Sequence, residues 1–140
     1  MENFFRERDC IKIQLRENLF LGDAEAYKTL KELKADKITS VIIVAHDLPV
    51  PNEDASGVRV YKVGLLNGPN YTWVKDLACH IPKYLIQNGE KVLVQSVSGM
   101  RRGAFVAARI ICETENTSIY ERFLEIQKVV PDLDLSKVYF

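Results

Sequence analysis

Two short apolar runs do the most to restrict the fold of this chain. Thr39–Ala45 reads TSVIIVA and Lys91–Val94 reads KVLV, and neither run alternates polar with apolar residues. A β-strand without such alternation suits a parallel sheet that helices cover on both faces. We therefore predict an α/β fold in which helices flank a central, mostly parallel sheet.

The segments around these runs predict the remaining helices and strands. Asp23 and Ser118 are residue types that cap helix N-termini, and Pro82 predicts a kink or break near His80. Further strands are predicted at Ile11–Leu15, Leu19–Leu21 and Val58–Val63, and helices at about 24–35, 71–87, 103–113 and 119–130.

Length and charge restrict the class of protein. The chain has 140 residues, of which 47% are hydrophobic, so we expect a single domain, residues 1–140, with a sizeable core. Basic and acidic residues balance at 19 each. A net charge of zero gives no reason to expect nucleic acid or a membrane as a partner, although a local positive pocket remains compatible with it.

The cysteines and the N-terminus indicate the compartment. Cys10, Cys79 and Cys112 are widely spaced and form no CxxC pair. They predict neither a disulfide framework nor a zinc site, so we expect no metal or cofactor. The charged N-terminus lacks the apolar core of a signal peptide. These features favour a reducing compartment, cytoplasmic or nuclear, and we interpret Cys112 as a small core residue.

The clearest chemistry lies between the second apolar run and the helix that follows it. A strand that feeds a helix through a tight loop leaves the first N–H groups of the helix free to bind an anion. Gly99 lets the loop turn so that its N–H groups point inward, and Arg102 can donate two hydrogen bonds to phosphate. The sequence predicts a phosphate-binding loop of Gln95, Ser96, Val97, Ser98, Gly99, Met100, Arg101 and Arg102.

The segment KVLVQSVSGMRRGAFVAA resembles the signature of the dual-specificity and protein-tyrosine phosphatases, His-Cys-x5-Arg-Ser/Thr. Other segments resemble the same family in the same order, namely NLFLGDAEAYKTLKELKADKITSVIIVA, GVRVYKVGLLNGPN and SIYERFLEIQKVVPDL. The resemblance covers about residues 18–133. It implies the fold of the small dual-specificity phosphatases and, for active members, phosphomonoester hydrolysis through a cysteinyl phosphate.

The chain departs from the family pattern at four chemical positions. Ser96 occupies the position of the nucleophilic cysteine, and Gln95 stands where the family has histidine. Asn67 stands at the position of the general-acid aspartate, and Gly103 replaces the usual Ser or Thr. A serine hydroxyl stays protonated near neutral pH, and an amide cannot protonate a leaving group as a carboxylic acid does.

The residues that the resemblance implies for gripping phosphate, Gly99 and Arg102, are retained. We therefore interpret the chain as a catalytically impaired pseudophosphatase that binds phosphate or a protein phosphorylated on Tyr, Thr or Ser. An active phosphatase captured as a Cys-to-Ser mutant is the alternative, because it would explain Ser96 alone. A scaffold with an empty pocket is the second alternative, and a 5′-phosphorylated RNA or a phosphoinositide would fit a similar loop.

Several residues near these positions have less specific interpretations. We expect Arg101 to be a charge at the rim of the loop or a salt-bridge partner rather than a phosphate ligand, and Met100 to pack within the loop. Tyr71 and Trp73 either line the mouth of the pocket or simply pack. The loop after Thr39–Ala45 carries three acidic residues, one of which could approach the pocket: Asp47, Glu53 and Asp54.

Overall fold

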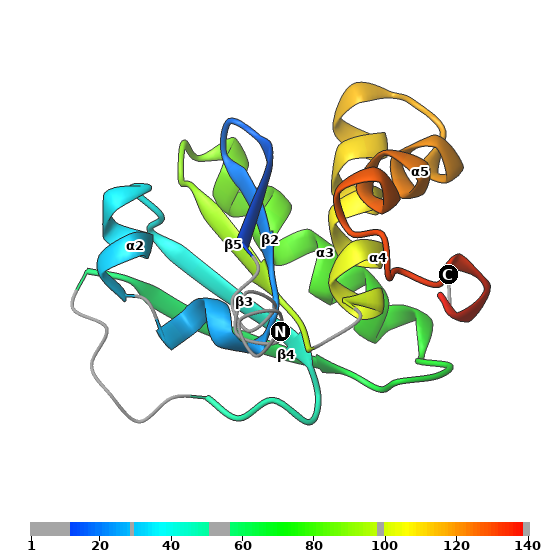
Figure 1. Cartoon of the computed structure of the whole chain (residues 1–140), viewed down its shortest axis with the longest axis horizontal. Helices are drawn as coiled ribbons and strands as arrows, with labels where there is room; N and C mark the ends of the chain where they lie inside the picture. Colours follow the sequence, from blue (N-terminus) through cyan, green and yellow to red (C-terminus); the bar gives the residue numbers. More distant parts are fainter. Residues whose placement is uncertain (1–11, 29, 51–56, 98–99, 139–140) are drawn as a thin grey trace, which may run out of the picture.

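The computed structural model describes residues 12–28, 30–50, 57–97 and 100–138, which form a five-stranded sheet in the order β1-β2-β5-β3-β4 (Figure 1). The β1 strand is antiparallel to β2, and the other neighbouring pairs are parallel. The predicted α/β fold with a mostly parallel sheet is confirmed. The strands are β1 (Lys12–Arg16), β2 (Leu19–Gly22), β3 (Ser40–Ala45), β4 (Arg59–Leu65) and β5 (Val92–Gln95).

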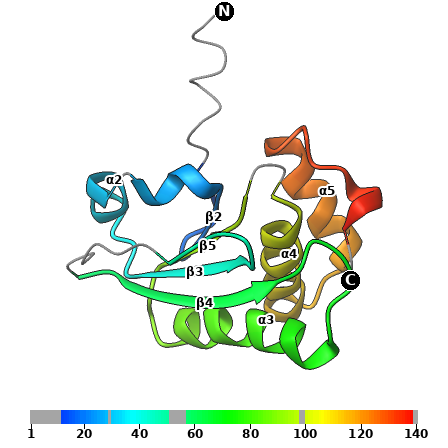
Figure 2. The same cartoon turned by 90° about the horizontal axis from the view of Figure 1, so that it is seen from below.

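Helices cover both faces of this sheet (Figure 2). The α3 and α4 helices lie on one face, with α5 packed against α4, while η1 and α2 lie on the other face. None of the described helices is both long and apolar enough to cross a lipid bilayer. The helices are η1 (Ala24–Lys28), α2 (Leu30–Ala35), α3 (Thr72–Gln87), α4 (Arg101–Glu115), α5 (Ile119–Val129) and η2 (Leu135–Lys137).

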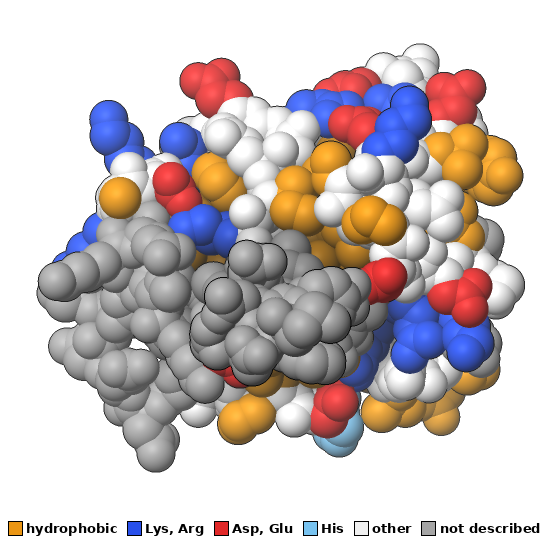
Figure 3. Space-filling view, viewed as in Figure 1, with side chains coloured by type: hydrophobic (Ala, Val, Ile, Leu, Met, Phe, Trp, Pro, Cys, Tyr) orange, Lys and Arg blue, Asp and Glu red, His pale blue; other side chains and the backbone are white. Residues whose placement is uncertain are grey.

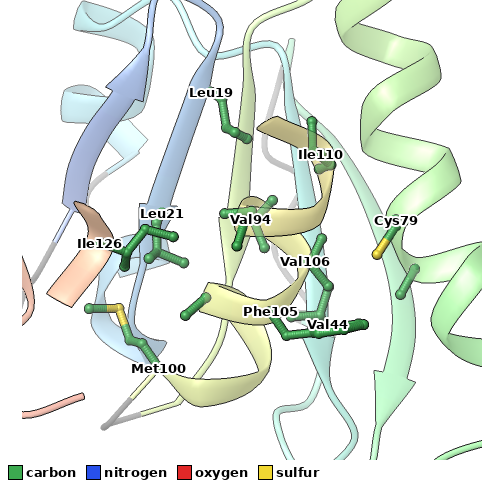
Figure 4. Close-up of a cluster of buried hydrophobic side chains, with 14 of the residues drawn as sticks. Leu19, Leu21, Val44, Cys79, Val94, Met100, Phe105, Val106, Ile110 and Ile126 are labelled. Carbon is green, nitrogen blue, oxygen red and sulfur yellow. The ribbon is translucent and has the colours of Figure 1, made fainter. Parts of the chain in front are cut away.

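The central strands contribute to two buried clusters, which explains their unbroken apolar sequences. Ile42 and Val44 of β3 face the cluster beneath α3 and α4, whereas Val41 and Ile43 face the smaller cluster beneath η1 and α2. Successive strand side chains point to opposite faces, so a strand covered on both sides needs apolar residues at every position. Figure 4 shows α4 contributing residues to the larger cluster: Phe105, Val106 and Ile110.

The sequence predicts one helix over residues 24–35, but the structure has two separate helices there, η1 and α2. Asp23 caps its start as expected, because the Asp23 Oδ1 accepts a hydrogen bond from the Glu25 N–H at 3.0 Å. The Ala26 N–H then bonds to the carbonyl of Asp23, three residues back, at 3.2 Å. This is the tighter 3₁₀ pattern, which seldom extends beyond one turn. The segment therefore forms η1 and then a separate short helix, α2.

Of the kink or break predicted near His80, the break does not occur, because α3 runs without interruption through Pro82. A proline inside a helix costs about 3 kcal/mol, but buried residues on both sides of it, Ala78 and Leu85, fix the helix against the core. The N-cap predicted for α5 is confirmed, since the Ser118 hydroxyl accepts from the Glu121 N–H.

An ion-pair network joins the β1–β2 hairpin to the last two long helices. The Arg16 Nε donates to Glu115 Oε2 at 2.6 Å, and its Nη1 donates to Glu125 Oε2 at 2.5 Å. These hydrogen bonds from Arg16 hold the pKa of both glutamates below the ordinary range.

The two described cysteines differ in burial. Cys79 lies in the core, and burial raises its pKa to about 12. Cys112 is half-buried rather than part of the core, which corrects the sequence interpretation, and burial raises its pKa as well. Cys10 lies outside the described residues.

Candidate functional site

The candidate site lies where the parallel strands end. In open parallel sheets, ligands bind beyond the carboxyl ends of the strands, where the connections diverge. Four strands of this sheet run parallel, with β5 between β2 and β3. The segments that follow these four strands begin with Asp23, His46, Leu66 and Ser96, so they meet at one edge of the sheet. The predicted loop is the continuation of β5.

Gln95 anchors the start of this loop. Its side chain is buried, and its Nε2 donates to the carbonyl oxygens of Asp23 at 3.1 Å and Ala24 at 3.2 Å. These bonds tie the end of β5 to the turn after β2. Because the Gln95 amide donates to two backbone carbonyls, it stabilises the start of the loop. An amide does not gain or lose a proton near neutral pH, so Gln95 cannot act as an acid or a base.

Ser96 is enclosed at the base of the loop. Its exposed fraction is 0%, and its N–H donates to the Gly22 carbonyl at 2.9 Å. Its Oγ is buried and has no hydrogen-bond partner in the described part of the chain. A nucleophilic serine needs an adjacent base to take its proton, and no described residue bonds to this Oγ to serve as one.

Gly103 has a steric reason to lack a side chain. A Cβ at this position would lie 2.9 Å from the Ser96 Cβ and 2.7 Å from the Leu21 Cδ1. Both distances are shorter than van der Waals contact, so the first turn of α4 can approach Ser96 only because residue 103 is glycine. A Ser or Thr at this position, as in the family signature, would require both neighbours to shift.

Met100 forms the junction between the loop and α4. Its backbone is left-handed, with φ 52° and ψ 26°, and its N–H donates to the Val97 carbonyl at 2.9 Å. Its side chain is buried beside Leu21 and Ile126 (Figure 4), so the predicted packing role is confirmed. This packing offsets the strain of a positive φ at a residue with a Cβ. Ser98 and Gly99, and hence the turn expected at Gly99, lie outside the described residues.

Arg102 is buried and paired. Its exposed fraction is 8%, and its Nη1 donates to Asp47 Oδ1 at 2.7 Å and to the Leu65 carbonyl at 2.9 Å. The hydrogen bond from Arg102 also holds the pKa of Asp47 below the ordinary range. Asp47 is therefore the acidic residue that approaches the site, whereas Glu53 and Asp54 lie outside the described residues.

The loop after β4 reaches the first turn of α4. Asn67 is exposed, and its Oδ1 accepts from Arg101 Nη2 at 3.3 Å. Asn70 holds this loop closed, because it accepts from the Leu66 N–H at 2.8 Å and donates to the carbonyls of Leu66 and Gly68. Sequence reasoning missed Asn70, although an Asn within LNGPN is a residue type that closes turns through its side chain.

A pocket lies between the loop after β4 and the start of α4. It is lined by Asn67, Asn70, Arg101 and Arg102, together with Lys75 of α3 and Lys137 of η2. The sequence did not link either lysine to the site. Tyr71 and Trp73 are 77% and 66% exposed. Trp73 lines a different pocket beside Cys79.

Solved structures of phosphatases are similar to this chain over most of its length. Human DUSP28 superposes with a TM-score of 0.76 at 21% identity, covering 91% of this chain and 89% of that chain. A mouse putative dual specificity phosphatase complexed with zinc tungstate gives 0.77 at 21% identity, covering 88% and 77%. The chain has the dual-specificity phosphatase fold.

A third solved structure with this fold is the human tyrosine phosphatase-like serine/threonine/tyrosine-interacting protein. It gives a TM-score of 0.71 at 23% identity, covering 84% of this chain and 82% of that chain. No protein-family model and no curated protein matches the sequence. These similarities establish the fold of the chain and do not extend to the roles of its site residues.

Proposed function

We propose that the chain binds phosphate, or the phosphorylated side chain of a protein, in the loop Gln95–Arg102 and hydrolyses phosphomonoesters weakly or not at all. The observation that carries this proposal is the state of Ser96. Its hydroxyl, at the position that the sequence resemblance assigns to the nucleophile, is fully enclosed and has no described partner that could remove its proton.

The chemistry of the neighbouring positions supports the loss of hydrolysis. A cysteine at a helix N-terminus forms a thiolate at neutral pH, because the dipole and loop N–H groups lower its pKa. A serine hydroxyl is far less acidic and would need a base. Asn67, which the resemblance places at the general-acid position, carries an amide that bonds to Arg101 and cannot protonate a leaving group as a carboxylic acid does. Ser96 therefore impairs the nucleophilic attack on phosphorus, and Asn67 impairs the protonation of the leaving group.

Arg102 and the N-terminus of α4 support the proposed binding of phosphate. The Arg102 Nη1 is engaged, but its Nε and Nη2 make no hydrogen bond within the described residues. The first N–H groups of α4 also lack helical partners and favour an anion. A phosphate that reached this site would accept charge-assisted hydrogen bonds from both sources.

An anion titration combined with a turnover assay tests this proposal. We expect phosphate or tungstate at millimolar concentration to shift the backbone amide signals of residues 97–102 in NMR spectra, and an aryl phosphate to remain uncleaved. Arg102→Lys should weaken binding, because lysine cannot replace the planar fork. The matched control is Arg59→Lys, since Arg59 is an exposed arginine on β4. Saturable turnover that disappears in Arg102→Ala would contradict the proposal.

A scaffold without a ligand is the second candidate function. The Asp47–Arg102 ion pair favours it, because a carboxylate already occupies one edge of the phosphate-binding guanidinium. If no amide of the loop shifts at millimolar anion, this second candidate replaces the first.

A further inference from the structure

The outward side of α3 carries a row of large side chains. They are spaced by four, three and four residues, so they follow one side of the helix. All four are exposed, with exposed fractions of 41% for Leu77 and 57% for Tyr84. The rings of His80 and Tyr84 stack with their centroids 6.3 Å apart, so the two form one platform. We call this set the α3 row: Trp73, Leu77, His80 and Tyr84.

No other helix or strand of the described residues covers the α3 row. The opposite side of α3 is fixed to the core by buried residues such as Ala78 and Leu85, and Figure 2 shows α3 at the outer edge of the layer that it forms with α4. Figure 3 shows further hydrophobic side chains exposed at its lower right, where Figure 1 places the segment that leads from β4 into α3. An exposed apolar patch of this kind often marks an interaction site.

A second row, of charged side chains, runs beside the α3 row. Arg109 contacts Asp76 at 2.7 Å and Glu113 at 3.1 Å, and Glu113 contacts Lys83 at 3.3 Å. The four charges alternate in sign and cancel, and they line one pocket together with residues of the α3 row. This charged row ends in an acid at Asp76 and in a base at Lys83. Within the described residues, Asp76 Oδ2 accepts no hydrogen bond and the Lys83 Nζ uses one of its three donors.

We infer that two copies of this chain associate through α3. The two α3 rows pack antiparallel around a twofold axis that passes between Leu77 and His80. Trp73 of each copy then faces Tyr84 of the other, because these two residues lie equally far from the axis at opposite ends of the row. Aromatic pairs of this kind strengthen an apolar contact. The surface is separate from the loop Gln95–Arg102, so the association does not depend on phosphate binding.

The charges favour a second copy as the partner. A twofold interface brings the same surface of two molecules together, so this surface has to be complementary to itself. In the antiparallel arrangement the acidic end of each charged row, at Asp76, lies beside the basic end of the other, at Lys83. Both ends therefore join opposite charges. A parallel arrangement would place each end against its own copy, and like charges would repel.

The exposed area of the α3 row predicts a weak dimer. A fully exposed aromatic side chain offers about 150–250 Å², so the exposed parts of the four side chains offer roughly 400 Å² on each copy. With the flanking charges, the two copies would bury about 800–1,000 Å², which is typical of transient complexes. We therefore expect a dissociation constant of about 10–100 μM.

Sedimentation equilibrium at protein concentrations of about 5–500 μM tests the dimer. The mass of the unmodified protein should rise from monomer towards dimer over this range. Leu77→Asp should raise the dissociation constant at least about tenfold, because it places two carboxylates close together at the axis. The matched control is Leu124→Asp, since Leu124 is a leucine of α5 with a similar exposed fraction of 37%. A monomer at every concentration, or a dimer that Leu77→Asp leaves intact, would overturn the inference.

Charge exchange tests the antiparallel arrangement. Asp76→Lys makes both ends of the charged row basic and Lys83→Glu makes both ends acidic, so each variant alone should dimerise at least about tenfold more weakly. An equimolar mixture of the two variants should recover the affinity to within about threefold, because every acidic end again meets a basic end. This recovery requires both variants to be folded. Lys128→Glu, which changes an exposed lysine of α5, is the control and should leave dimerisation unchanged. A mixture that associates no better than either variant alone would overturn the arrangement.

Discussion

Removing the carboxylate of Asp47 should strengthen phosphate binding. Asp47 Oδ1 accepts from the Arg102 Nη1 at 2.7 Å, so the carboxylate competes with an incoming phosphate for the same guanidinium. Asp47→Asn keeps an oxygen that can accept this hydrogen bond but removes the negative charge. The substitution therefore tests the charge while it preserves the contact.

The size of the effect follows from the exposure of the pair. A hydrogen bond to a charged group contributes about 1.5–3 kcal/mol, but the Asp47 side chain is 62% exposed. Solvent screening reduces such a pair to about 1 kcal/mol or less. Since about 1.4 kcal/mol corresponds to a factor of ten in affinity, Asp47→Asn should tighten orthophosphate binding up to about fivefold.

Calorimetric or NMR titration with orthophosphate at pH 7 and constant ionic strength measures this gain. Asp76→Asn is the matched control, because Asp76 pairs with Arg109 at the same 2.7 Å and has a similar exposed fraction of 54%. The control should leave the affinity unchanged. Weaker binding in Asp47→Asn would refute the reasoning, since it would mean that Asp47 orients Arg102 for the anion instead of competing with it.

Three further predictions concern catalysis and stability. Ser96→Cys alone should give weak turnover in a phosphatase assay. Adding Asn67→Asp should raise the turnover of alkyl phosphates by about 10²–10⁴-fold. Full activity of the single Ser96→Cys variant would instead indicate an active phosphatase whose catalytic cysteine has been replaced by serine. Gly103→Ser should destabilise the fold by about 1–3 kcal/mol in urea unfolding, because its Cβ meets Leu21 and Ser96; an unchanged midpoint would contradict this. The ion pairs of Arg16 with Glu115 and Glu125 should contribute a constant stability above the ordinary glutamate pKa of 4.5, and this contribution should be lost as the pH falls below 4.5 and the glutamates are protonated. Thermal melts should therefore show a smaller loss of stability with falling pH in Arg16→Gln than in the unmodified protein. An equal loss in the two proteins would contradict the assignment to these glutamates.

The elements that hold the loop could be predicted from the sequence because their signals are local. The unbroken apolar sequence of β3 and the run before Gln95 identify buried strands, and the glycine, arginine and apolar residues that follow identify the loop and α4. The N-cap at Ser118 is equally local, because the capping side chain and its partner are three residues apart.

The partners of the site residues could not be predicted, since they depend on tertiary packing. The sequence indicated that one of three acidic residues after β3 could approach the pocket, but it did not single out Asp47 or the carbonyl of Leu65, which lie 55 and 37 residues from Arg102. Lys137 reaches the pocket only because η2 folds back toward α4. The division of the predicted helix over 24–35 depends on the 3₁₀ turn after Asp23, which hydrophobic periodicity does not distinguish from an α-helix.

The burial of Cys79 has a consequence for the response of this protein to oxidants. Peroxides and alkylating reagents attack the thiolate, and a pKa raised to about 12 leaves almost none of it at neutral pH. Phosphatases that depend on a loop thiolate are inactivated when that sulfur is oxidised. Neither Arg102 nor the backbone N–H groups contain sulfur, and the Met100 thioether of the loop is buried, with an exposed fraction of 1%. We expect phosphate titrations before and after hydrogen peroxide treatment to coincide, so the chain would keep its ligand under conditions that inactivate thiolate-dependent phosphatases.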